Sequence, residues 1–182
     1  MTPSDNDSSD RALLSAVGKG EARALETLFR RHNVRVFRFV MRIVANRATA
    51  EDVLSEVFLQ IWQHAGRYEG RSAPTTWMLS IAYNKAVSTL RQRRETIGIE
   101  ESGFDEMPDN DDTADVALEK RQTSEELAAA IARLSPDHRA IVDLCYFQEL
   151  SVAEAADVLG IPEATVKTRM FYARKQLADL LK

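Results

Sequence analysis

Residues 150–177 read LSVAEAADVLGIPEATVKTRMFYARKQL and carry the signals of two short helices joined by a tight turn. Ser151 and Glu154 have the spacing of a capping box, so a helix should begin directly after the serine. Gly160 follows the last apolar residue of that helix, where a left-handed C-cap is common. Pro162 suits the first turn of a second helix, because the amide hydrogen that proline lacks would be unpaired there. The stretch therefore predicts a helix-turn-helix.

The predicted second helix has a basic outer face. Residues 163–182 contain five Lys or Arg and two acids, a local net charge of +3. An apolar stripe recurs at helical spacing, which leaves the polar residues between its members outside. An ordinary amphipathic hairpin with a solvated basic face would share this pattern. The cap, glycine, proline and cations together favour DNA binding by a face formed by Thr165, Lys167, Thr168, Arg169 and Tyr172.

The bulk composition is that of an ordinary soluble globular protein, with 182 residues of which 45% are hydrophobic. No apolar run approaches the roughly 20 residues that span a bilayer. The polar, acidic start MTPSDNDSSD lacks the features of a signal peptide. The one cysteine, Cys145, cannot form an internal disulfide, which fits a reducing compartment. We therefore expect a cytoplasmic protein.

The net charge of −4 is unevenly distributed. Residues 1–94 have 15 basic and 9 acidic side chains, residues 95–119 have 10 acids and no base, and residues 120–182 have nine of each. An overall acidic balance therefore does not exclude a nucleic-acid partner. The acidic segment has few large apolar residues and no helical or strand period, so we predict a flexible linker over residues 95–119.

The chain before the linker has the pattern of an all-α domain over residues 10–94, preceded by a disordered N-terminus over residues 1–9. A long helix should end near Asn46, and Thr49 has capping-box-like spacing with Asp52. The next helix has two adjacent apolar rows, Val53/Val57/Ile61 and Leu54/Phe58/Trp62. Six large apolar side chains are more than a helix needs to pack on the core along one narrow strip. Part of this face is therefore a candidate partner surface, although core packing explains most of it.

A loop over residues 65–76 leads into a cationic helix that should begin at Trp77. That helix has Lys85, Arg91, Arg93 and Arg94 and no acid before residue 95. Cations near a helix C-terminus are also stabilised by the helix macrodipole, so they do not by themselves indicate a ligand. Rings and cations in such a loop and helix are typical of single-stranded DNA binding, in which bases stack and phosphates form ion pairs.

The chain after the linker predicts four helices over residues 120–182. Ser135 is a candidate N-cap followed by Pro136, and Ile141, Leu144 and Phe147 should form the buried stripe of the next helix. The three histidines are scattered, and neither a phosphate-binding loop nor a metal motif is present. We therefore expect neither an enzyme nor a cofactor or metal. Cys145 should be a small buried hydrophobe.

The order of these parts resembles the extracytoplasmic-function (ECF) group of bacterial sigma-70 family factors. The resemblance covers roughly residues 10–180. It rests on AEDVLSEVFLQIWQ, then TWMLSIAYNKAVSTLRQRR, the acidic linker, and LSPDHRAIVDLCYFQELSVAEAADVLGIPEATVKTRMFYARKQL. It implies two small helical domains joined by the linker, a region 2-like domain over 10–94 and a region 4-like helix-turn-helix domain over 120–182.

The resemblance also implies roles for particular residues. Contacts to the polymerase clamp fall on Asp52, Val53, Glu56, Phe58 and Trp62. Recognition and melting of the minus-ten element fall on Arg67, Arg71, Trp77, Asn84, Lys85, Arg91, Arg93 and Arg94, although a buried core role for Trp77 is favoured over base contact. Recognition of the minus-35 element falls on Thr165, Lys167, Thr168, Arg169, Arg174 and Lys175, of which the last two are expected on phosphate.

The implied function is transcription initiation as a dissociable subunit of RNA polymerase, controlled by an anti-sigma factor and tied to a stress response. The implied partners are the clamp and flap of core polymerase, promoter DNA as duplex and single strand, and the anti-sigma factor. One alternative is a sigma-like decoy that binds an anti-sigma factor without DNA, which could dispense with the cations of the last helix. Another is a conventional helix-turn-helix regulator, which would need a dimerisation segment that we do not find.

Overall fold

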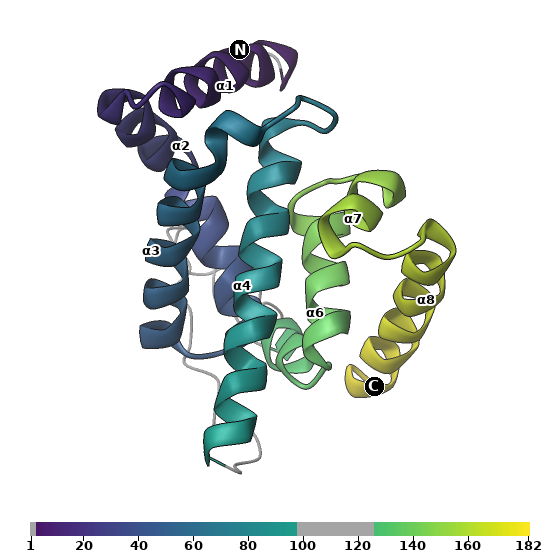
Figure 1. The fold of residues 1–182 in the computed structure, drawn as a ribbon. Helices are drawn as coiled ribbons and strands as arrows, with labels where there is room; N and C mark the ends of the chain where they lie inside the picture. Colours follow the sequence, from purple (N-terminus) through teal and green to yellow (C-terminus); the bar gives the residue numbers. More distant parts are fainter. Residues whose placement is uncertain (1–2, 98–125) are drawn as a thin grey trace, which may run out of the picture.

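The structure is a computed structural model that describes residues 3–97 and 126–182, and it is helical in both parts (Figure 1). The first part contains α1 (Pro3–Gly18), α2 (Ala22–Val44), α3 (Arg47–His64), the 3₁₀ turn η1 (Ala65–Arg67) and α4 (Pro74–Ile97). Helices α2, α3 and α4 pack on one another, and α1 crosses one end of this bundle (Figure 1). Large apolar side chains fill the bundle, including Leu28, Phe39, Ile43, Ile61 and Leu79.

Helix α1 begins at Pro3, which corrects our prediction of a disordered N-terminus at residues 3–9; residues 1–2 of that prediction lie outside the described residues. Its sequence is too polar for the apolar period to predict this start. The helix is held by the buried side chains of Leu14 and Val17 and, nearer its start, by long-range polar contacts. Arg31 Nη1 donates to Ser9 Oγ at 2.9 Å and to Asp10 Oδ1 at 2.8 Å, and His32 Nε2 lies 2.7 Å from Asp10 Oδ2.

Helices α3 and α4 each begin before the predicted residue. The N-cap of α3 is Asn46, whose side chain accepts a hydrogen bond from Thr49 N at 2.9 Å, so Thr49 is not the cap that we predicted. Ala45, with φ of 53°, adopts the left-handed conformation that ends α2. Pro74 opens α4 three residues before Trp77, because proline fits the first helical turn.

The second part contains a helix over residues 126–132, α6 (Pro136–Val142), the π-helical turn η2 (Asp143–Phe147), α7 (Val152–Leu159) and α8 (Glu163–Leu180). The predicted capping box is present, since Ser151 Oγ accepts from Glu154 N at 3.2 Å and the glutamate accepts from the Ser151 amide at 2.9 Å. Gly160 has φ of 64°, and the helix-turn-helix is confirmed. Phe147 is 47% exposed, so its predicted place in the buried stripe is wrong: the wider π turn carries it outward.

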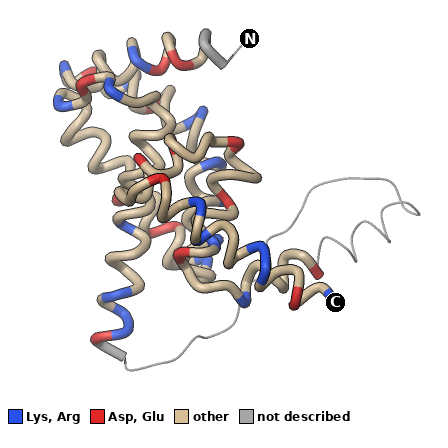
Figure 2. The backbone as a smooth tube through the Cα atoms, turned by 90° about the vertical axis from the view of Figure 1, so that its right-hand side faces the viewer, with Lys and Arg blue, Asp and Glu red and all other residues tan. Residues whose placement is uncertain are grey.

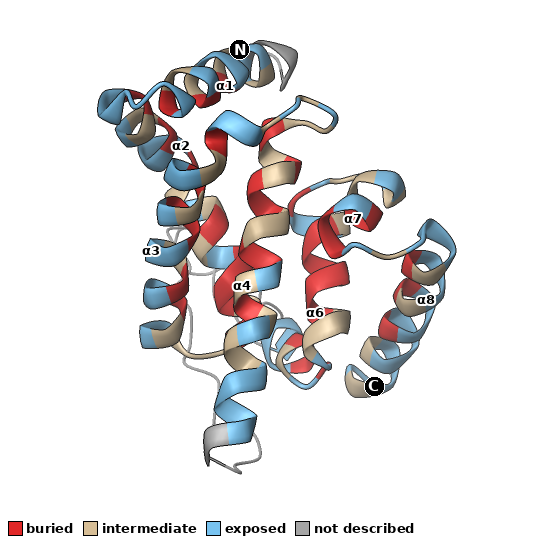
Figure 3. Ribbon diagram, viewed as in Figure 1, coloured by how far each residue is buried: buried red, intermediate tan, exposed pale blue. Residues whose placement is uncertain are grey.

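The two parts pack directly against each other. Helix α7 lies along α4, and α6 contacts α2 (Figure 1). One continuous group of buried side chains joins them, with Leu79 and Ala82 of α4 in the same core as Val158 and Leu159 of α7 (Figure 3). Most of the predicted linker lies outside the described residues. Its first three residues, 95–97, instead continue α4.

Candidate nucleic-acid and polymerase interfaces

Helix α8 has a buried inner face and a polar outer face, as its sequence predicts. Val166, Met170 and Ala173 are buried against the rest of the C-terminal part (Figure 3). The outer face is exposed at four of the predicted minus-35 residues, while Thr165 and Arg169 are half-buried. The four exposed residues are Lys167, Thr168, Arg174 and Lys175.

The cations of α8 differ in how firmly they are held. The Lys167 ammonium lies 4.0 Å from Glu163 in an exposed pair, which contributes little and leaves the lysine available to a ligand. Arg174 lies with its guanidinium carbon 5.6 Å from the ring centroid of Tyr146. Arg169 pairs with Asp137 at 2.9 Å, and Tyr83 of α4 donates to the same aspartate at 3.2 Å. Arg169, one of the six residues predicted to recognise the minus-35 element, is therefore engaged within the molecule.

Helix α4 has a basic end that extends beyond the packed bundle. Figure 2 shows Lys and Arg gathered on its last turns, and residues 91–95 are all exposed. Arg93 Nη1 donates to Thr49 Oγ1 at 2.8 Å, whereas the Arg91 and Arg94 side chains lie at the surface. Asn84 is also exposed on this helix, and Lys85 pairs with Glu56 of α3 at 3.0 Å.

Residues 66–73, which include the last two residues of η1 and the segment that follows it, form a small ordered loop before α4. The Tyr68 hydroxyl donates to the Ser72 carbonyl at 2.5 Å, and the Tyr68 ring lies 5.3 Å from that of Trp77. Burial raises the pKa of the Tyr68 hydroxyl further above neutral pH, which is consistent with its role as a hydrogen-bond donor. Trp77 is half-buried against the core, while Arg67 and Arg71 are exposed. The loop thus has two exposed cations close in sequence to the packed rings of Tyr68 and Trp77.

The predicted polymerase surface is only partly exposed. Val53 is 1% exposed and Phe58 6%, so both belong to the core, which corrects their prediction as contacts. Val53 is buried with Val57 and Ile61 of its own row, whereas Phe58, from the other row, packs edge-on against Phe29 of α2 with ring centroids 4.8 Å apart. Asp52, Glu56 and Trp62 remain exposed.

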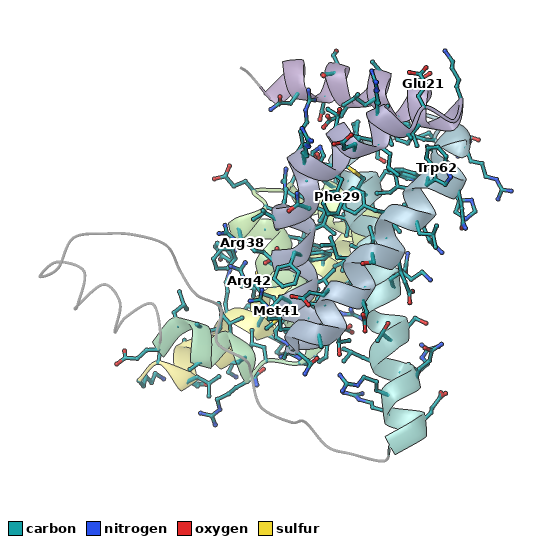
Figure 4. The ribbon with its side chains drawn as sticks, turned by 90° about the vertical axis from the view of Figure 1, so that its left-hand side faces the viewer. Glu21, Phe29, Arg38, Met41, Arg42 and Trp62 are labelled. Carbon is teal, nitrogen blue, oxygen red and sulfur yellow. The ribbon has the colours of Figure 1, made fainter. Side chains whose placement is uncertain are left out.

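The sequence analysis missed part of this surface. Phe29 is 41% exposed and Leu59 55%, and Figure 4 shows Phe29 and Trp62 on neighbouring helices of the same side. The helical period does not show this, because Phe29 follows the buried Leu28 in the sequence, and only the packing of α2 on α3 places it on the same side of the molecule as Trp62 (Figure 4). Phe29, Leu59 and Trp62 thus form an exposed apolar surface, which we call the α2–α3 surface.

Within residues 3–97 and 126–182, no group of three or more His, Cys, Asp or Glu side chains could hold a metal ion. No helix in those two ranges is long and apolar enough to cross a membrane. The features that remain for function are the exposed cations of α8 and α4, the loop over residues 66–73 and the α2–α3 surface.

Comparison with solved structures shows the fold. The chain is similar to CnrH, solved in complex with the cytosolic domain of CnrY, with a TM-score of 0.67 and 24% identity over 95% of this chain and 97% of that one. It is also similar to the sigma factor RpoE of Bartonella quintana, solved with the anti-sigma factor NepR, with a TM-score of 0.72 and 21% identity over 86% of this chain and 95% of that one.

Comparison of sequences shows the family. Residues 28–96 match the family described as Sigma-70 region 2, and residues 124–177 match Sigma-70, region 4. The chain is 32% identical to the ECF RNA polymerase sigma factor SigL of Mycobacterium tuberculosis over 91% of this chain and 93% of that one. It is 33% identical to SigM of the same species over 95% and 85% of the two chains. The chain therefore belongs to the ECF RNA polymerase sigma factors.

Proposed function

We propose that the chain docks on core RNA polymerase through the α2–α3 surface and reads a promoter at two places. In this proposal the outer face of α8 binds the minus-35 element as duplex. The loop over residues 66–73 and the exposed side of α4 bind the minus-ten element after the strands separate. Residues 10–94 and 120–182 then act as the region 2 and region 4 domains.

The observation that carries this proposal is the two-sided character of α8. Its inner face is anchored in the core, while Lys167, Thr168, Arg174 and Lys175 stay exposed on the other side. A helix that follows a tight, capped turn and keeps its outer face polar can enter a major groove without losing its own packing. Cations there neutralise phosphates, and side chains near the helix start reach base edges.

The minus-ten half of the proposal rests on aromatic rings and cations on one side of the first domain. Bases released from a duplex stack on rings, and the backbone is held by cations. Arg67 and Arg71 lie on the loop, Asn84 is exposed on α4, and Arg91 and Arg94 extend the same helix. Strand opening costs a few kcal/mol per unstacked step, which such contacts offset on a docked strand.

Sigma factors are initiation factors and not enzymes, so synthesis of the transcript belongs to the polymerase. We place the chain in the cytoplasm, where the polymerase acts. We also propose control by an anti-sigma factor. The similar structures of CnrH and RpoE were solved in complex with CnrY and with the anti-sigma factor NepR, which supports such a partner here.

The proposal is tested by run-off transcription with core polymerase and a promoter library, with and without the chain. We expect transcripts from a subset of promoters only when the chain is present. Lys167→Ala should lower activity about tenfold at promoters that depend on the minus-35 element, the loss of one contact of about 1–3 kcal/mol. Lys19→Ala removes an exposed cation far from α8 and should leave activity unchanged.

Two further variants separate the other surfaces. Trp62→Ala should weaken polymerase binding in a titration and leave binding to duplex minus-35 DNA unchanged. Asn84→Ala should alter base preference in the minus-ten element, while Ser88→Ala, one turn further along the same exposed face of α4, should not. If no promoter in the library is opened in the presence of the chain, the proposed function is wrong.

A further inference from the structure

Helix α1 contacts the loop over residues 66–73, from which it is far removed in sequence. It crosses the end of the bundle where α3 passes through η1 and the loop into α4 (Figure 1). The main link is Arg11, which lies 59 residues from Gly70. None of the roles assigned above involves this arginine.

The Arg11 guanidinium binds two carbonyls of the loop at once. Nη1 donates to the Gly70 carbonyl at 3.0 Å, and Nη2 donates to the Ser72 carbonyl at 3.4 Å. Its central carbon also lies 5.9 Å from the ring centroid of Tyr68. The planar fork of arginine suits two acceptors and a ring face together, which an ammonium group cannot reproduce.

The contacts of Arg11 with the loop are linked to the packed rings of Tyr68 and Trp77. The Ser72 carbonyl accepts from both Arg11 and the Tyr68 hydroxyl, and the Tyr68 ring packs on Trp77 at the start of α4. Arg11 is therefore one end of a chain of contacts that runs through the loop to α4. Cooperative networks of this kind restrict a loop more than one hydrogen bond would.

Two glycines show how closely α1 approaches this segment. Gly70 has φ of +72°, and a Cβ added there would lie 2.7 Å from Arg11 Nη1. A Cβ added at Gly18 would lie 2.8 Å from Gly66 Cα, a backbone atom that cannot move aside cheaply. Helix α1 thus lies close to the loop both at its first residue and at its middle.

Helix α1 is itself fixed in place. The Asp10 side chain is 2% exposed and is held by Arg31 and His32 of α2 at 2.8 and 2.7 Å. Asp10 and Arg11 are adjacent, so this buried anchor sets the rotation of α1 and directs the next side chain to the loop. Leu14 and Val17, on the following turns, are fully buried.

We propose that Arg11 is a positioning residue for base recognition, which holds the loop over residues 66–73 in the conformation that receives the melted strand. This inference rests on the proposed minus-ten function of that loop. Arg11 holds the carbonyls of Gly70 and Ser72, the two neighbours of Arg71, while the exposed Arg71 side chain pairs with Glu69 at 2.5 Å. A loop ordered before binding loses less conformational freedom when the strand arrives.

The first experiment measures loop order in the free chain by trypsin cleavage after Arg71, which is followed by mass spectrometry. Arg11→Ala should raise the cleavage rate about fivefold or more, as expected when a net hydrogen bond that limits local opening is lost. Arg23→Ala also removes one exposed arginine and one trypsin site, and it should leave that rate unchanged. Arg11→Lys keeps a donor without the fork and should give an intermediate rate.

The second experiment measures binding of the holoenzyme to single-stranded minus-ten oligonucleotides and their single-base variants. Arg11→Ala should reduce the ratio between the preferred and substituted sequences, whereas a merely structural loss would weaken all of them equally. Unchanged cleavage after Arg71, or an unchanged ratio, overturns the inference. If the wild-type holoenzyme binds no oligonucleotide selectively, the proposed function fails instead, because the cleavage result does not depend on DNA.

Discussion

The Cys145 thiol lies in the π-helical turn at the end of α6, half-buried beside α8. Burial raises the pKa of the thiol above its ordinary value, and the Arg174 guanidinium opposes this only in part. The thiolate is the reactive form of cysteine, so the environment protects this side chain from alkylation and oxidation. This agrees with the sequence-based interpretation of Cys145 as a packing residue.

We therefore expect Cys145 to be alkylated by iodoacetamide more slowly in the folded chain than in guanidinium chloride at pH 8. Because a raised pKa keeps more of the thiol protonated, the pH at which the rate reaches half its maximum should also be higher in the folded chain. The rate is followed by mass spectrometry. A folded chain with an unshifted or lower midpoint would contradict this account of the thiol.

At the scale of single elements, the start of α7 depends on one reciprocal cap. Ser151 and Glu154 satisfy each other's backbone amides, and Gly160 closes the other end in a left-handed conformation. Helix α7 has only eight residues, so end effects are a large part of its stability. Helix α8 is oriented by the turn that follows.

Ser151→Ala should lower the free energy of unfolding by about 1 kcal/mol, because an amide of the first turn loses its acceptor. Denaturant unfolding followed by circular dichroism measures this loss. Ser15→Ala is the matched control, since Ser15 is exposed within α1 and alanine is the better helix former. Equal stability of the two variants would show that the capping box does not stabilise the fold.

Elements with local signals could be predicted from the sequence. The caps at Ser135 and Ser151 and the left-handed Gly160 depend on residues a few positions apart, and all are present. The start of α3 could not be assigned correctly, because Asn46 and Thr49 both have the chemistry of a cap. Helix α1 is anchored through Ser9 and Asp10 by partners in α2 that no local pattern shows.

The candidate site residues likewise divide into those that the sequence could predict and those that needed the structure. The exposed cations of α8 followed from helical period, because the buried stripe fixes the opposite face. Burial of Val53 and Phe58 could not be judged from their own helix, since the packing of α3 against α2 and α4 decides which of its side chains are covered. The contacts of Arg11 and Arg169 join residues distant in the chain and needed the structure.

At the scale of the whole molecule, a polar network joins the two halves beside their shared apolar core. Arg42 of α2 binds Asp143, whose side chain has no exposed area, and Gln148 donates to the same aspartate at 2.8 Å. Arg35 donates to the Gln148 side chain at 2.5 Å. The Arg42 guanidinium carbon also lies 3.5 Å from the centroid of the Phe147 ring.

The π-helical turn explains how one arginine reaches both groups. Gln148 N donates to the Asp143 carbonyl five residues earlier, which widens the turn. Asp143 then lies on one side of Arg42 and Phe147 on another. Burial raises the pKa of the Asp143 carboxyl, and the Arg42 guanidinium and the Gln148 amide oppose that shift. The charged carboxylate therefore depends on these partners.

Arg42→Ala should loosen the contact between the two halves, because Asp143 would lose its principal partner while still buried. Breaking one side of a buried ion pair costs about 3–5 kcal/mol, and separation of the halves relieves this cost by letting water reach the carboxylate. We expect a lower melting temperature and a larger radius of gyration in small-angle X-ray scattering.

Arg38 lies one turn earlier on α2 and is exposed, as Figure 4 shows, so Arg38→Ala makes the same change in charge outside the network. That control should match the wild type in both measurements. If Arg42→Ala also matches it, the apolar core alone holds the halves together.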